Sequence, residues 1–242
     1  PQVPVGTYIV VVESEGFKSF RRANVVIVAG GTAQANAQLE VGQVTESVQV
    51  SGSAAQLQTE TAKTSTAVTQ KMVDELPLVV GGAMRGAFDL ALVSPQANQP
   101  EGVGGGEDKT FNVGGGQAAS YGATLDGVSI LTARFNSVEW ANVNTPPVDA
   151  ITEFSVETNG FKAEYGRAQG GMITFASKSG TNEFHGSAYE FLRNNAFDAR
   201  RFFEAERGVY KQHDFGYSAG GPVIIPKLYN GKNRTFFFTS AE

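Results

Sequence analysis

The first forty residues alternate short apolar runs with turn residues. Apolar residues fill Thr7 to Val12 and Asn24 to Val28, and turn residues such as Ser14-Glu15-Gly16 and Gly30-Gly31 follow each run. A third run, Thr32 to Leu39, places alanine or leucine at every second position, which is the period of a strand. We therefore expect three short strands. Because so few strands bury little surface, we expect further strands of this unit upstream.

The middle of the chain combines helical patterns with glycine-rich strands. Two segments have apolar residues at helical spacing and end at or just before a proline: 69–76 and 85–93. Four segments have the composition of strands: 110–113, 121–130, 152–158 and 172–177. Three segments have the composition of linkers or exposed loops: 51–66, 100–106 and 131–147. The pattern predicts a small α+β unit.

Beyond Gly180 the chain changes to aromatic strands separated by charged loops. The predicted strands cover 184–192, 213–221 and 235–242. In the second of them Phe215, Tyr217 and Ala219 point one way, while Gly216, Ser218 and Gly220 point the other. This alternation is typical of a barrel strand that faces lipid. A soluble β-sandwich also produces it, so both interpretations remain open here.

Composition excludes several classes of protein. The chain has 242 residues, 41% of them hydrophobic, which is enough to build a core and argues against wholesale disorder. It has no cysteine, so disulfide scaffolds and thiolate metal sites are excluded. The longest apolar run, Val25 to Ala29, is far shorter than a membrane-spanning helix requires. The net charge of −5 and the lack of a clustered basic region argue against nucleic acid. No leader sequence is visible, and we expect the chain to be part of a longer polypeptide.

The sequence offers no candidate catalytic, metal or cofactor site. The only histidines are His185 and His213, without the spacing of metal ligands. Residues 114–119 fit a dinucleotide-binding pattern formally, but a β-prone segment follows where a helix is required. The carboxylates of Glu153 and Glu157 are interpreted as exposed strand positions. An enzyme would need a buried polar cluster that the sequence does not show.

Three stretches resemble one family closely. They are FNVGGGQAASYGATLDGVSI (111–130), ITEFSVETNGFKAEYGRAQGGMITFASKSGTNEFHGS (151–187) and FLRNNAFDARRFF (191–203). Together they are similar to TonB-dependent outer-membrane receptors of the Oar-like branch, in which a carboxypeptidase-regulatory-like β-sandwich precedes a plug. The resemblance implies a mostly β chain of the α+β class, in four parts. These are the end of the sandwich (1–42), a linker (43–66), an α+β plug domain (67–182) and the first antiparallel strands of an incomplete β-barrel (183–242).

The resemblance also implies candidate sites. One segment is similar to a TonB box, which would pair with a sheet edge of a TonB-type periplasmic energy transducer: Glu46, Ser47, Val48, Gln49, Val50 and Ser51. A further sandwich strand or a linker strand is the alternative for this segment. Six residues are placed at the plug apex as substrate contacts: Arg134, Asn136, Glu139, Trp140, Asn142 and Asn144. Seven glycines are expected in tight turns of the plug: Gly114, Gly115, Gly116, Gly127, Gly166, Gly170 and Gly171.

Two functions from different classes fit these expectations. The first is part of an outer-membrane importer or exporter, whose plug gates an unknown substrate, whose barrel lies in lipid and whose N-terminal domain is periplasmic. The second is a structural or adhesive β-rich module that self-associates through exposed strand edges. The state of the chain without detergent distinguishes them, because ordered oligomers or fibres favour the second.

Overall fold

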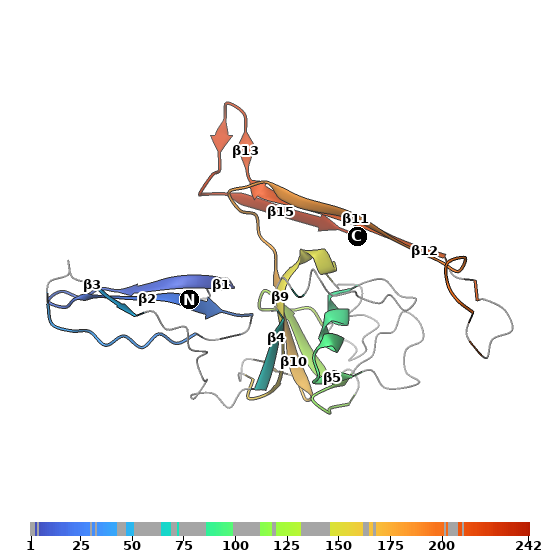
Figure 1. The fold of residues 1–242 in the computed structure, drawn as a ribbon, viewed down its shortest axis with the longest axis horizontal. Coiled ribbons are helices and arrows are strands. Elements are labelled where there is room, and N and C mark those ends of the chain that lie inside the picture. The colour runs from blue at the N-terminus through green and yellow to red at the C-terminus, as the bar shows by residue number, and fades with distance from the viewer. Residues whose placement is uncertain are drawn as a thin grey trace.

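The structure is a computed structural model, and it describes most of the chain with several gaps. The described ranges are 5–29, 33–42, 47–50, 64–68, 86–98, 112–117, 120–131, 146–161, 168–200 and 211–242, with Val3, Gly31, Met72, Tyr165, Gly166, Phe202, Gly208 and Val209. The described fold is mostly β, with three main sheets that follow one another along the chain (Figure 1). We call them the N-terminal, central and C-terminal sheets.

The N-terminal sheet has the order β1-β2-β3. Strands β1 (Gly6–Val12) and β2 (Ser19–Ile27) form an antiparallel pair, as the apolar runs predicted. The third strand is β3 (Ser47–Val50), which pairs with β2 in parallel. The predicted strand at 32–39 is wrong, because described residues 33–40 form no strand. Alternation alone does not supply a neighbour, and β3 takes the position beside β2 instead.

The central sheet has the order β4-β9-β10-β7-β8. Its strands are β4 (Thr64–Val68), β7 (Tyr121–Leu125), β8 (Val128–Ser129), β9 (Ile151–Asn159) and β10 (Gly171–Ser177). Only β10 and β7 run parallel to each other. The predicted strand at 121–130 is divided by a two-residue turn, in which Asp126 and Gly127 both have positive φ. This is the turn type that Asp-Gly favours in hairpins.

One face of the central sheet packs against a short helix. The predicted helix at 85–93 is a 3-10 helix, η1 (Ala87–Val93). Its Phe88 is buried, with its ring 5.3 Å from that of Phe175 on β10 in an edge-to-face arrangement. Near this core lie β5 (Ala97–Asn98), β6 (Asn112–Val113) and a second 3-10 helix, η3 (Val148–Ala150). The predicted helix at 69–76 lies outside the described residues except for Met72.

The opposite face of the central sheet is polar and also buried. Register places Thr124, Thr174 and Ser155 in one row across β7, β10 and β9, and all three side chains are buried. The interpretation of Glu153 and Glu157 as exposed is wrong, since they are 8% and 0% exposed. Strand β9 lies between β4 and β10, and both faces of the sheet are covered. The alternation of apolar and polar residues along β9 therefore does not indicate a face exposed to solvent.

The C-terminal sheet has the order β11-β12-β15 and is not closed. Its antiparallel strands are β11 (His185–Asn194), β12 (Lys211–Pro222) and β15 (Phe236–Ala241). The small ladder of β13 (Ile224–Ile225) and β14 (Tyr229–Asn230) projects from the connection between β12 and β15 (Figure 1). All three predicted aromatic strands are therefore confirmed, and they form a sheet of their own.

Candidate functional site

The TonB-box-like segment forms the outer strand of the N-terminal sheet. Residues 47–50 are β3, whose Val48 lies opposite Phe20 of β2 in the parallel register. Glu46 and Ser51 lie outside the described residues. One edge of β3 pairs with β2, and in the described sheet its other edge has no neighbouring strand. That open edge offers backbone donors and acceptors to a further strand.

The candidate substrate residues cannot be placed relative to one another. Arg134, Asn136, Glu139, Trp140, Asn142 and Asn144 all lie outside the described residues. The segment that contains them starts and ends close to the core, because Leu131 packs against the core cluster and Val148 is buried in it. Its function stays a prediction.

Four of the predicted glycines meet at one place in the central unit. A Cβ on Gly170 would lie 2.6 Å from the carbonyl oxygen of Val113, and one on Gly116 would lie 2.6 Å from the Cα of Gly170. A Cβ on Gly114, whose φ is +61°, would collide with the Gly170 carbonyl oxygen, and one on Gly171 would meet Val113. The turn after β6 therefore packs backbone to backbone against the start of β10. Gly166 differs, since it has open space around it and no positive φ.

The two faces of β12 differ in chemistry. Phe215 and Tyr217 are 71% and 48% exposed, whereas Ser218 on the other face is 8% exposed. The predicted alternation of apolar and small residues on this strand is confirmed. On the same outward face as Tyr217, the ring of Phe184 lies 6.4 Å from that of Phe237. The outward face of the C-terminal sheet thus carries aromatic residues, together with the exposed pair of Glu190 and His213.

The inward face of the C-terminal sheet is joined to the central unit. The hydroxyl of Ser187 on β11 donates to Oδ2 of Asp149 on η3 at 2.6 Å, and it lies 2.8 Å from the hydroxyl of Ser218. A carboxylate that accepts a hydroxyl proton forms a stronger contact than a neutral pair. These bonds fix which face of the sheet is turned toward the central unit.

Aromatic residues also occur on the inward face, which the alternation on β12 did not predict. Tyr189 lies directly opposite Gly216, and a Cβ at Gly216 would come within 2.6 Å of the Tyr189 ring. The ring of Phe191 is 5.4 Å from that of Tyr189. Glycine on β12 therefore makes room for an aromatic side chain of β11 to lie across it.

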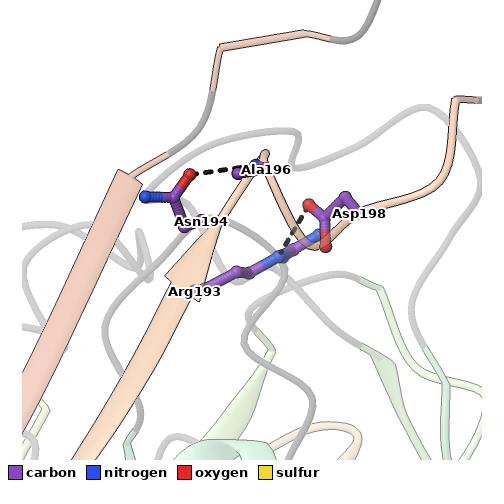
Figure 2. Close-up of polar contacts among 4 residues, drawn as sticks. All are labelled: Arg193, Asn194, Ala196 and Asp198. Carbon is purple, nitrogen blue, oxygen red and sulfur yellow. Dashed lines mark hydrogen bonds and ion pairs between the residues drawn. The ribbon is translucent and has the colours of Figure 1, made fainter.

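The motif FLRNNAFDARRFF contains the end of β11. The side chain of Asn194 accepts a hydrogen bond from the N–H of Ala196 at 2.9 Å, and Nε of Arg193 lies 3.6 Å from Oδ2 of Asp198 (Figure 2). An asparagine that bonds the backbone two residues on starts a turn. The ion pair is about 40% exposed on each side, 43% and 41%, so we expect it to contribute little stability. The motif ends the strand and directs the following loop.

The histidines do not form a metal or catalytic site in the described part of the chain. Nδ1 of His213 lies 3.0 Å from Oε1 of Glu190, and both side chains are exposed. Nδ1 of His185 lies 3.0 Å from the carbonyl oxygen of Glu183. No group of three or more His, Cys, Asp or Glu side chains arranged to hold a metal occurs among the described residues. Within the same residues, no helix is long and apolar enough to cross a membrane.

Among the described residues, the buried Ala29 joins the N-terminal part to the central sheet. The N–H of Ala29 donates to Oε1 of Glu153 at 2.9 Å, and the hydroxyl of Ser155 donates to the carbonyl oxygen of Ala29 at 2.9 Å. Burial raises the pKa of the Glu153 carboxyl, and the hydrogen bond from Ala29 opposes part of that rise. Sequence analysis missed this joint and the Asp149–Ser187 joint, because each connects residues far apart in the chain.

Two comparisons with known proteins agree with this architecture. Residues 176–242 match the family model of an outer membrane beta barrel domain. The chain is 26% identical over 241 residues to the TonB-dependent transporter Oar of Myxococcus xanthus, a match that covers 95% of this chain and 22% of that protein. The chain thus spans about a fifth of its relative.

A solved structure gives a weaker likeness. The crystal structure of the siderophore receptor PirA from Acinetobacter baumannii aligns with 66% of this chain and 22% of its own, at 20% identity and a TM-score of 0.47. The family match and the relative both point to the outer membrane. The chain is homologous to the TonB-dependent transporter Oar over nearly its whole length, and it carries outer membrane β-barrel sequence in residues 176–242.

Proposed function

We propose that the chain is the gating part of an outer-membrane transporter, in which the central unit is a plug and the C-terminal sheet is the first part of the barrel wall around it. One observation carries the proposal. The C-terminal sheet turns aromatic residues such as Phe215 outward, while on its other face Ser187, which is hydrogen-bonded to Ser218, donates to Asp149 of the central unit. A barrel strand that lies between lipid and a plug needs one apolar face toward the lipid and one polar face toward the plug.

Open strand edges fit the same proposal. In the described sheet, β11 and β15 each pair on one side only. Membrane-spanning strands need both edges paired, because lipid cannot bond the backbone. Further barrel strands would cover these edges. Pairing with other copies of the chain is the structural alternative, and a chain that forms ordered fibres in detergent-free buffer would favour it.

The N-terminal sheet fits the end of a β-sandwich. Ile9, Val11 and Val26 are 54%, 50% and 58% exposed, although each is a large apolar residue in a strand. Register places Val26 opposite Thr7, on the face that Ile9 and Val11 share. An apolar sheet face of this kind is normally covered by a second sheet. We assign it to the regulatory-like domain that precedes the plug.

The partner of β3 is, in this proposal, a TonB-type energy transducer. Strand addition makes main-chain hydrogen bonds, which transmit a pull with little demand on side-chain identity. Support comes from the placement of residues 47–50 on an open sheet edge, between the N-terminal and central units. Substrates would contact the segment that contains Arg134 and Trp140, and their identity depends on barrel loops outside this chain.

Replacing Val48 by proline in the full-length protein tests this assignment. Proline removes a backbone donor from the strand, so we expect energised uptake to be lost while ligand binding to cells is retained. The control is Val48→Ala, which keeps the donor and should retain uptake. Uptake at the wild-type rate in Val48→Pro would show that residues 46–51 are not the transducer's binding strand.

A further inference from the structure

The chain leaves and rejoins the central sheet at the same residue of β9. Ala29, which is 3% exposed, bonds to Glu153 and Ser155 through its own N–H and carbonyl group. Ala67 of β4 pairs with the same Ser155 in the antiparallel register. The intervening segment is therefore a loop whose two ends are fastened within one or two residues of each other on β9. The strand β3 lies inside that loop.

The contact of Ala29 with β9 and the pairing of β4 with β9 differ in kind. Strand β4 is an edge strand with a single neighbour, so it can separate from β9 one residue pair at a time, starting from Thr64. Ala29 is the second residue of a turn closed by the N–H of Gly31 and the carbonyl oxygen of Val28, 2.9 Å apart. While Ala29 is docked, a displacement of the loop is shared between the turn and β4. Once Ala29 is released, β4 is the remaining attachment of this loop to β9 among the described contacts.

We propose that the docking of Ala29 on Glu153 and Ser155 is a releasable latch, which holds the N-terminal sheet on the central sheet and protects edge strand β4 from separating from β9. The source of the pull that would open it rests on the proposed function, since β3 is the segment assigned to the transducer. The latch itself is a property of the unliganded chain. It therefore can be tested with no transducer, substrate or membrane potential present.

Glu153 makes the latch respond to pH. Burial raises the pKa of the docked carboxyl above its ordinary value of 4.5 by more than the hydrogen bond from Ala29 lowers it. Release of the turn would return the carboxyl to water, so the docked state binds a proton more tightly than the released state. Docking is therefore weakest when Glu153 is charged, and it strengthens as the pH falls through the interval between the raised and ordinary pKa values. Among the described residues, Glu157 is the other carboxylate on this face of β9. The described residues of the turn, Val28, Ala29 and Gly31, carry no titratable side chain.

Ala29→Pro is the direct test, because proline suits the second position of a turn but has no N–H to donate. We expect amide hydrogen exchange in β4, measured in the full-length protein without ligand, to speed up about tenfold. The matched control is Glu15→Pro, at the second position of the turn closed by the N–H of Phe17 and the carbonyl oxygen of Ser14. That turn lies in the N-terminal part, and among the described residues it makes no hydrogen bond to the central sheet, so exchange in β4 should not change.

Ser155→Ala tests the latch from the side of the central sheet, should Ala29→Pro disturb the N-terminal fold. It removes the donor to the Ala29 carbonyl group and should also speed exchange in β4. Its control is Thr174→Val, one strand away in the same row, where the hydroxyl is buried without a partner among the described residues. Wild-type exchange in β4 of Ser155→Ala, with the amides of β9 still protected, would overturn the latch.

Glu153→Gln tests the pH dependence, which a contact without a titrating group would not have. Glutamine keeps an acceptor oxygen for Ala29 and has no charge, so the protection factor of the β4 amides, which is corrected for the intrinsic pH dependence of exchange, should no longer change with pH above 4.5. An unchanged pH dependence would contradict the role of this carboxyl. Failure of the latch would leave the Val48→Pro uptake result unaffected, so the two proposals can fail separately.

Discussion

Replacing Gly170 by alanine is expected to destabilise the central unit by about 2–3 kcal/mol, the cost of forcing an extra methyl group into a closely packed backbone contact. The new Cβ would lie 2.6 Å from the Val113 carbonyl oxygen, and neither backbone segment can move away without disturbing β6 or β10. Gly114→Ala adds left-handed strain of about 1 kcal/mol to a similar collision. Amide exchange of β9 and β10 in the full-length protein should speed up about 30-fold or more.

Gly166→Ala is the matched control for these substitutions. Gly166 belongs to the same YGRAQGG motif, but a Cβ there meets nothing within 4 Å. We expect its stability to stay within about 0.5 kcal/mol of the wild type. If the amides of β9 and β10 exchanged as slowly in Gly170→Ala as in Gly166→Ala, the close contact between the turn after β6 and the start of β10 would be contradicted.

Phe215→Arg is expected to have the second large effect. Phe215 is 71% exposed on the outward face, near the middle of β12. An arginine facing the middle of a bilayer costs about 2–4 kcal/mol. We therefore expect a large loss of folded, heat-modifiable protein from outer-membrane fractions, measured by gel mobility without boiling.

Gln212→Arg is the control for the membrane prediction. Gln212 lies on the inward face of the same strand, where its amide donates to Oδ2 of Asp214 at 2.8 Å. A positive charge there faces the lumen and should leave the amount of folded protein nearly unchanged. Equal losses in both variants would mean that β12 does not separate lipid from a lumen.

The sequence predicted strands correctly where an alternating apolar pattern is bounded by turn residues. The apolar runs of β1 and β2, the period of β12 and the glycine-rich turn after β6 each follow from a short stretch of sequence. The resemblance then implied a division of the chain into domains, which stays a prediction. The contacts between the sheets followed neither from the sequence patterns nor from the resemblance.

The failures have a common physical cause. The segment 32–39 alternates like a strand, but a strand forms only where another backbone offers hydrogen bonds, and β3 occupies that place. Glu153 was interpreted as exposed because strands usually turn polar residues to solvent, whereas the turn at Ala29 covers it. Long-range partners of this kind are separated by 124 residues and leave no local signal.

The separation of the C-terminal sheet from the other two is the observation on which the account depends. In Figure 1 the strands β11, β12 and β15 form their own sheet rather than folding into the central one. Its contacts with the central unit come from one face, through residues such as Ser187 and Asp149. Its other face carries the exposed side chains of Phe215 and Tyr217, and we expect this face to contact lipid.

A spin-label scan of β12 in bilayers tests this claim most directly, and these 242 residues contain no native cysteine that would have to be replaced first. Cysteine would replace each residue from Asp214 to Ala219 in turn in the full-length protein, and collisions with oxygen and with a water-soluble nickel complex would be measured. The account predicts that labels at 215, 217 and 219 collide mainly with oxygen, whereas labels at 214, 216 and 218 do not. Equal access of the nickel complex to both sets of positions would show that β12 lies in water and would contradict the account.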